Sequence, residues 1–272
     1  MLIPHAVFAG NGAALTKGSG TDSDALAWQA AVVAASGSVS ASYLAAVSTY
    51  IAGLKADGIW SGLDYLIPYA AENATAASID FVGRLAHTLN NSPTFTSLVG
   101  YQGDSTSSFI NTNYNPASGS HWTQNDASLG AWIVTGDTNN SSRNYLGSHA
   151  GRNFFGKHSA GADWFCVNNP VSTDWTLGTE AGFFHTQRTA STTSALFRNG
   201  VSVQANGNSS AAVNSQNLYS LASNGNPGPG ASNFSNGQLA LVFAGASLTG
   251  AESAFFNRTH TFLNTINSGS FP

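Results

Sequence analysis

Residues 195–205 read ALFRNGVSVQA, which places Asn199 and Gly200 between two short runs of alternating apolar and polar residues. An Asn-Gly pair in that setting is a strong signal for a β-hairpin. A three-residue loop ending at Gly200 pairs Phe197 with Val201 and keeps the apolar side chains of both runs on one face. The pattern therefore predicts a hairpin with a bulged loop, packed by that face into a β core.

Short runs of this kind continue through most of the chain. From about residue 60, apolar segments alternate with clusters of Asn, Gly, Ser and Pro. The expected strands are residues 63–70, 95–99, 108–113, 129–135, 144–147, 164–168, 182–189, 194–198, 201–205, 217–222 and 238–244. Strands at this spacing, with turn signals between them and no helical pattern, predict an antiparallel sandwich or jelly roll.

Two helical patterns precede the strands. The first run, capped by Ser23 or Asp24, ends near residue 35, and the second opens at Ser40 or Ser42 and stops at Gly58. Their outer faces are rich in Ala and Ser, which favours packing against a partner. Residues 1–20 are Gly-rich and are expected to form an extended arm. Residues 1–58 are thus predicted to be an arm and helical hairpin for attachment, and residues 59–272 a β domain.

Composition limits the function classes. Charged residues make up 8% of the chain, against about 25% in an average protein, and the net charge is −4 with only three lysines. This excludes a nucleic-acid footprint or a polybasic membrane patch. No window approaches 18 consecutive apolar residues, so no membrane span is expected. The single cysteine, Cys166, lies in an apolar run and is expected to be a buried thiol.

Four pieces of the sequence, taken in order, resemble the concanavalin-A-like jelly roll of the laminin-G-like kind. They are residues 91–95 with 100–110, residues 127–134, residues 183–189 with 195–203, and residues 236–243 with 247–252. The last piece is the most specific, because a strand is followed by Leu-Thr-x-x-Glu, in which Thr249 and Glu252 predict a capping box. The resemblance covers about residues 60–267. It implies a mainly β fold, an antiparallel β-sandwich with a short N-terminal arm and helical hairpin.

Some proteins of this fold are glycoside hydrolases, and retaining hydrolysis needs two carboxyl groups about 5–5.5 Å apart. On one strand that chemistry would read Glu-x-Asp-x-Glu, which is absent, and Glu72, Glu180 and Glu252 are isolated. We therefore expect that the protein is not an enzyme. The seven histidines form no zinc motif. The resemblance implies Ca²⁺ as the one cofactor to consider, with Asp104 and Asp137 as candidate ligands.

Recognition of glycans is the remaining chemistry. A sugar is held by an aromatic face for its apolar side and by Asn, Asp, Arg or His for its hydroxyls. Such residues gather between residues 137 and 158 and again beside Asp174. The candidates are Asn139, Asn140, Arg143, Tyr145, Arg152, His158 and Trp175. The competing interpretation is that they are turn residues and core tryptophans.

The arrangement of an arm, a helical hairpin and a jelly roll is similar to the lectin-fold proteins carried by tailed bacteriophages. It implies a virion-surface protein, a fibre, spike or decoration, whose jelly roll contacts host surface polysaccharide. Residues 1–58 would bind other virion proteins, and a homo-oligomer is expected. The N-terminus has no basic residues before its apolar patch, so no signal peptide and a virion localisation are expected. The alternatives are a free carbohydrate-binding lectin and, as a third, a glycosidase or lyase.

Overall fold

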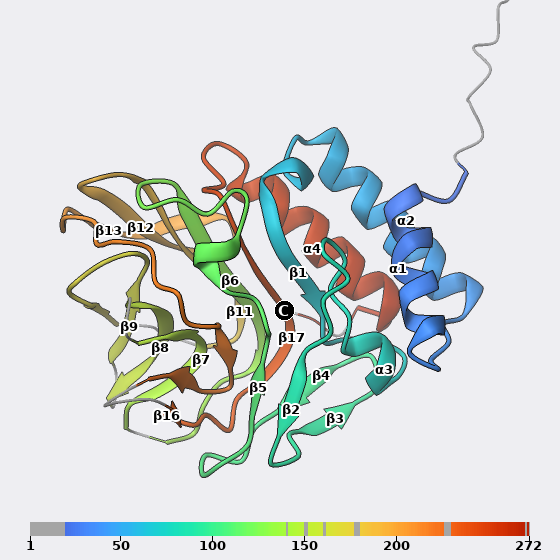
Figure 1. The fold of residues 1–272 in the computed structure, drawn as a ribbon, viewed down its shortest axis with the longest axis horizontal. Helices are drawn as coiled ribbons and strands as arrows, with labels where there is room; N and C mark the ends of the chain where they lie inside the picture. Colours follow the sequence, from blue (N-terminus) through green and yellow to red (C-terminus); the bar gives the residue numbers. More distant parts are fainter. Residues whose placement is uncertain are drawn as a thin grey trace, which may run out of the picture.

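The computed structural model describes residues 20–139, 141–149, 152–159, 162–176, 180–225, 230–269 and 271. Three layers follow one another: helices, a first sheet and a second sheet (Figure 1). The helices are α1 (Ser23–Ala34), α2 (Ala41–Ala56), α3 (Ala74–Ala77) and α4 (Glu252–Ile266), with short turns η1 (Trp60–Gly62) and η2 (Pro116–Ser118). None of the described helices is long and apolar enough to cross a membrane.

Two sheets form the sandwich. The first has the order β13-β12-β11-β6-β17-β4-β3, with β1 also on β17, and the second has the order β10-β9-β8-β7-β14-β5-β2, with β15 beside β7 and β16 beside β15. The strands of the first sheet are β1 (Leu63–Pro68), β3 (Thr94–Thr96), β4 (Gly100–Gln102), β6 (Ala127–Thr135), β11 (Gly182–Ala190), β12 (Thr193–Arg198), β13 (Val201–Asn206) and β17 (Gln238–Gly245). Those of the second are β2 (Thr88–Asn90), β5 (Phe109–Asn111), β7 (Arg143–Ser148), β8 (Asn153–Ser159), β9 (Ala162–Cys166), β10 (Thr173–Trp175), β14 (Tyr219–Ser220), β15 (Ser223–Asn224) and β16 (Ala231–Ser232). The prediction of a mainly β, antiparallel sandwich is confirmed.

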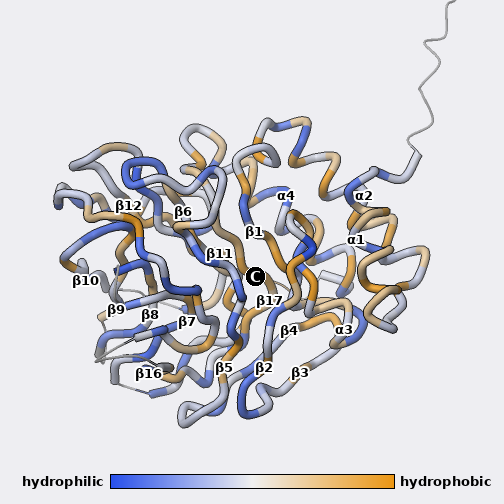
Figure 2. The backbone as a smooth tube through the Cα atoms, viewed as in Figure 1, coloured by the Kyte–Doolittle hydropathy of each residue, from blue (hydrophilic) through white to orange (hydrophobic). Residues whose placement is uncertain are grey.

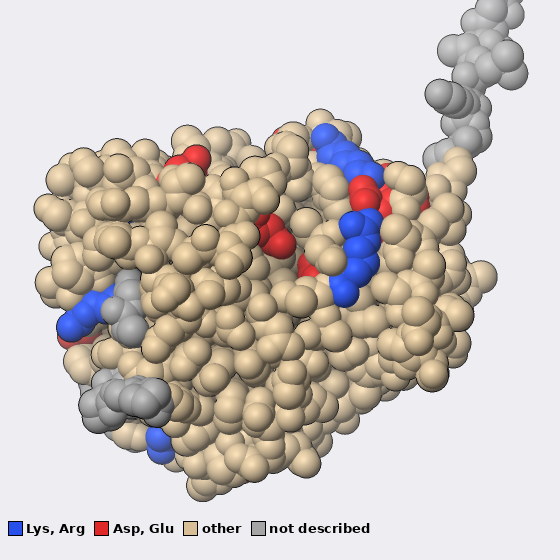
Figure 3. Space-filling model, viewed as in Figure 1, with Lys and Arg blue, Asp and Glu red and all other residues tan. Residues whose placement is uncertain are grey.

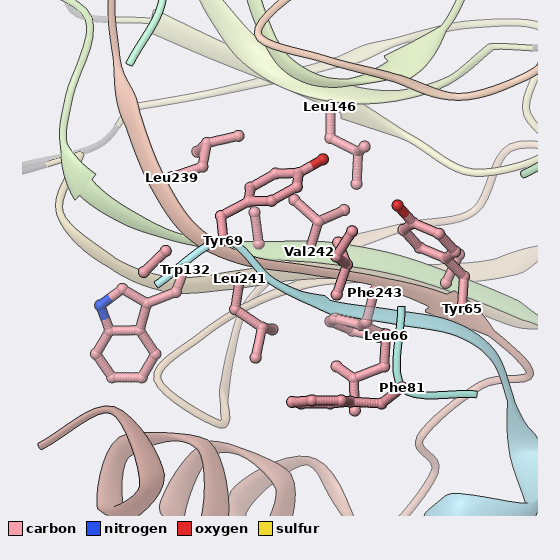
Figure 4. Close-up of a cluster of buried hydrophobic side chains, with 14 of the residues drawn as sticks. Tyr65, Leu66, Tyr69, Phe81, Trp132, Leu146, Leu239, Leu241, Val242 and Phe243 are labelled. Atoms are coloured by element: carbon pink, nitrogen blue, oxygen red, sulfur yellow. The ribbon is translucent and has the colours of Figure 1, made fainter. Parts of the chain in front are cut away.

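The central strands of the first sheet, β6 and β17, are buried on both faces. Figure 4 shows Tyr69 and Val242 directed toward Leu146 of the second sheet, whereas Leu241 and Phe243 lie on the opposite side, toward a helix. All five are buried. A strand covered on both faces reads as a continuous apolar run rather than an alternating one, and β17 has the sequence QLALVFAG.

The helices cover the outer face of the first sheet. Phe255 of α4 packs edge-on against Phe243 at 4.8 Å between ring centroids, and Trp28 of α1 packs edge-on against Phe81 at 5.1 Å. The hydroxyl groups of Tyr50 in α2 and Thr259 in α4 share a hydrogen bond of 2.8 Å. One hydrophobic cluster includes buried residues of α1, α2, α4 and both sheets. The division at residue 58 stays a prediction, and the core is continuous across it.

The hairpin of residues 195–205 has a different register from the one that we predict. Asn199 and Gly200 have φ angles of 50° and 76°, and Phe197 pairs with Ser202. This is a two-residue turn with positive φ at both positions, which Asn-Gly favours. The extra residue falls within the strands instead, where the register shifts between Leu196 and Phe197. The prediction of a three-residue loop is therefore wrong.

The predicted capping box is also wrong. The residue before α4 is Ala251, which makes no side-chain cap hydrogen bond. The Glu252 carboxylate instead accepts a hydrogen bond of 2.8 Å from the Gln187 amide on the first sheet, so it serves tertiary packing.

The single cysteine, Cys166, is buried as expected, and burial raises the pKa of its thiol.

Candidate ligand-binding site

Strand β10 forms one edge of the second sheet, and its residues point to alternating faces. Asp174 lies opposite Trp164 of β9, and Trp175 lies opposite Asp163. Because side chains alternate along a strand, Asp174 shares the outer face with Trp164, and Trp175 turns toward the interior of the sandwich. Trp175 packs there against Phe184 at 6.4 Å between centroids.

On the outer face, the Trp164 indole lies against two neighbouring strands. Its Nε1 donates a 2.9 Å hydrogen bond to Asn144 Oδ1 on β7. Gly156, on the intervening strand β8, pairs with both residues. The missing side chain at Gly156 is required, because a Cβ there would lie 2.0 Å from the carbonyl oxygen of Arg143. Gly156 thus permits the close approach of β7 and β8 beside the Asn144 side chain that holds the indole.

His158 covers the exposed side of this indole. The two rings stack at 4.7 Å with an interplanar angle of 8°. His158 Nδ1 lies 2.9 Å from Asp174 Oδ1, and the two side chains are 40% and 57% exposed. A hydrogen-bonding pair is therefore presented to solvent at the edge of the second sheet.

A hollow of about 330 Å³ opens beside this pair, where β10 of the second sheet approaches β13 of the first. It is lined by Ala162, Asp174, Trp175, Thr176 and Gln204. We call it the β10 hollow. The two edge strands are joined next to it by a side-chain hydrogen bond from Asn206 to Thr173. One aromatic ring, one carboxylate, one amide and one hydroxyl residue thus line a single concave surface.

Of the predicted site residues, Trp175 lines the β10 hollow, and His158 lies beside it on the outer face of the sheet, paired with Asp174. Tyr145 and Asn139 lie in a different polar cluster. The Tyr145 hydroxyl donates to Glu180 and accepts from the Asp137 N–H. Burial and the Glu180 charge raise the pKa of Tyr145 far above its usual range, and the side chain is buried. Tyr145 therefore connects the segments around Asp137 and Glu180 by hydrogen bonds. It does not line the β10 hollow.

The other predicted residues are also placed away from the hollow. Arg143 begins β7, where it pairs with Lys157. Arg152 lies in the turn before β8, and its N–H donates to the His149 carbonyl. Arg152 also helps to lower the pKa of His149, after the larger effect of burial. Asn140 lies outside the described residues.

The two calcium candidates stay predictions, and both carboxylates accept hydrogen bonds from backbone groups of the protein. Asp104 accepts hydrogen bonds from three backbone N–H groups, which hold the pKa of its carboxyl well below the usual range despite an opposing contribution from burial. The Asp137 carboxylate accepts from the N–H groups of Asn139 and Asn236. Across the described part of the chain, no group of three or more His, Cys, Asp or Glu residues is placed to hold a metal ion.

No protein-family model matches the sequence, and no curated protein matches it. Solved structures match its fold. A mutant of HCR/D aligns over 74% of this chain and 52% of its own length, with 10% identity and a TM-score of 0.51. Trypanosoma rangeli sialidase in complex with 2,3-difluorosialic acid aligns over 74% and 33%, with 12% identity and a TM-score of 0.49. The botulinum neurotoxin serotype D binding domain aligns over 68% and 48%, with 11% identity and a TM-score of 0.44.

The likeness to the HCR/D mutant shows the fold alone, an antiparallel β-sandwich. This chain spans between 33% and 52% of the length of the three structures. The sequence-based expectation that the protein is not an enzyme is corrected, because sialidases stand among the matching structures beside binding domains. The missing Glu-x-Asp-x-Glu strand concerns one arrangement of carboxylates in one class of hydrolase, and the fold leaves catalysis open.

Proposed function

We propose that the protein binds glycans in the β10 hollow. The observation that carries the proposal is the meeting of Trp175, Asp174 and Gln204 around one concavity of about 330 Å³. A sugar ring has an apolar face that an indole covers, and its hydroxyl groups pair with carboxylates and amides. His158, held by Asp174, adds an imidazole at the rim.

The charge of the lining favours a neutral saccharide. Asp174 is the one charged residue among the described residues that line the hollow, and its side chain is 57% exposed. A carboxylate accepts hydrogen bonds from sugar hydroxyls but repels an anionic sugar, and no Lys or Arg belongs to the described lining. Binding of neutral hexose-containing glycans is therefore preferred to binding of acidic ones.

The proposed setting for this binding is the surface of a phage particle, with the protein attached by its helical side as a homo-oligomer. Two features support it. Most of the face in Figure 3 carries no charged side chains, apart mainly from a group at the helical end, and Leu26 and Val33 of α1 are 46% and 59% exposed. Figure 2 shows α1 and β10 at opposite ends of the molecule, so attachment and glycan binding would not compete. Absence of the protein from purified particles, analysed by mass spectrometry, would remove this part of the proposal.

A glycan array tests the binding itself. The full chain should bind at least one class of neutral glycans, and Trp175→Ala should weaken that binding about tenfold or more, because aromatic stacking contributes about 1–3 kcal/mol. Trp60→Ala is the matched control, since Trp60 is also partly exposed and lies next to α2. Equal binding by Trp175→Ala and the native chain, or binding to acidic glycans only, would refute the proposal.

A further inference from the structure

A groove of about 380 Å³ runs between α2 and α4 on the side away from the first sheet. Its floor contains the stacked rings of Tyr50 and Phe262, 4.7 Å apart with an interplanar angle of 8°. Small side chains from both helices form its walls, among them Ala45, Ala46 and Thr261. A concave surface with aromatic rings below and small side chains at its sides is suited to receive larger apolar side chains.

The polar groups around this groove already have partners. Thr49 Oγ1 donates to the Ala45 carbonyl at 2.9 Å, and Thr265 Oγ1 donates to the Thr261 carbonyl at 2.7 Å. The Arg258 guanidinium binds Asp57 at 2.8 Å. An occupant therefore gains little from hydrogen bonding here, and it must be held by burial of apolar surface.

The chain itself supplies a segment of that kind. Residues 1–19, which precede the described part, read MLIPHAVFAGNGAALTKGS and contain one lysine and no acidic residue. Their apolar side chains concentrate in residues 2–8, and Gly-containing sequence follows. Such a cluster is costly to leave in water, and the glycines after it permit the chain to turn.

The described chain begins beside α2, on a side of this helix that does not line the groove. The Asp22 N–H donates to Ser48 Oγ of α2 at 2.7 Å, and the Asp22 carboxylate pairs with Lys55 of α2 at 2.8 Å. The eleven residues between Phe8 and Gly20 span up to about 36 Å when extended. A helix with its side chains is about 10–12 Å across, so residues 2–8 can reach around α2 to its other side.

We propose that residues 2–8 dock in the α2–α4 groove of their own molecule. The segment would bury its apolar side chains on Tyr50 and Phe262 and would tie the arm to the helical layer. This proposal is independent of glycan binding, because it concerns the opposite end of the molecule (Figure 2).

Photo-crosslinking of the full chain tests the proposal. p-Benzoylphenylalanine replaces Phe8, and mass spectrometry locates the crosslinks after irradiation of dilute protein. We expect crosslinks to residues 42–50 and 258–265 within one molecule. Ala45→Glu should lower their yield about tenfold, because it places an unpaired carboxylate in an apolar contact.

Ala30→Glu is the matched control, since Ala30 is an exposed alanine on the neighbouring helix α1. It should leave the yield unchanged. Ile3→Asp should act like Ala45→Glu without altering the groove. Crosslinks outside the groove, crosslinks only between molecules, no crosslinks, or equal yields from Ala45→Glu and Ala30→Glu would overturn the proposal.

Discussion

At the scale of single residues, His87 and His185 connect the core to pH. Both rings are buried, and within the described part of the chain neither has a hydrogen-bond partner. His87 lies between Tyr69 and Tyr101, and His185 stacks on Phe197. Burial lowers the pKa of His87 to about 4 and that of His185 to about 3. The native state therefore holds two neutral imidazoles that the unfolded chain protonates near pH 6.5.

The sign of the pH dependence follows from these shifts. Both groups have a pKa in the folded state below that of the unfolded state, so the unfolded chain binds more protons at mildly acidic pH. We expect the free energy of unfolding to fall between about pH 6.5 and 4, by roughly 1 kcal/mol per pH unit for each histidine. Urea unfolding at several pH values measures this slope. His185→Phe should make it shallower, and an unchanged slope would mean that His185 is not buried as a neutral ring.

At the scale of elements, the turn of the β12–β13 hairpin contacts the first turn of α4. Ser253 Oγ donates to the Gly200 carbonyl at 3.0 Å. A Cβ on Gly200 would lie 2.7 Å from Ser253 Cα, whereas one on Gly58, which also has positive φ, would meet nothing within 4 Å. Substituting these two glycines therefore distinguishes the cost of a Cβ at positive φ, which both share, from the cost of crowding, which applies only to Gly200.

We expect Gly58→Ala to lower the free energy of unfolding by about 1 kcal/mol, the cost of a left-handed backbone with a Cβ. Gly200→Ala should cost about 1–3 kcal/mol more, because the Cβ also overpacks against α4. Chemical denaturation of both variants gives the two values. Equal costs would indicate that the hairpin does not contact the helix.

Sequence patterns predicted the elements that form a long apolar run or a helical apolar stripe between turn residues. They located α1, α2 and the long strands β6, β11 and β17. They missed β8, whose sequence NFFGKHS is interrupted by Gly156, where the backbone of β7 leaves no room for a side chain. They also missed β10, which has only three residues. The packing of the helices on the outer face of the first sheet could not be predicted, because an apolar stripe on a helix does not indicate which surface the helix packs against.

The site was predicted only in part, for similar reasons. Trp175 and His158 were predicted because aromatic and polar residues stand near one another in the sequence, and their part in binding stays a prediction. Gln204 was not, because β13 meets β10 only when the two sheets close into a sandwich. Tyr145 was predicted to contact the ligand, but its side chain is buried. The pairing of β7 with β8 shifts register between Asn144 and Leu146, and the sequence gives no signal for this shift.

At the scale of the whole molecule, α1 of the helical layer and strand β10, whose residues line the β10 hollow, lie at opposite ends of the molecule (Figure 2). The first sheet is covered by helices on its outer face, so that face offers little room for a ligand. The edge where β10 and β13 approach each other carries an open concavity instead. Glycan binding at that edge is the central claim.

The most direct test is a ¹H–¹⁵N spectrum of the full chain, in which each of the six tryptophans gives one indole N–H signal. Titration with a neutral glycan that binds on the array should shift the Trp175 signal and leave that of Trp60 in place. A saturable shift confined to Trp175 and its neighbours is the predicted result. Saturable binding that moves other indole signals and leaves Trp175 unchanged would contradict the account.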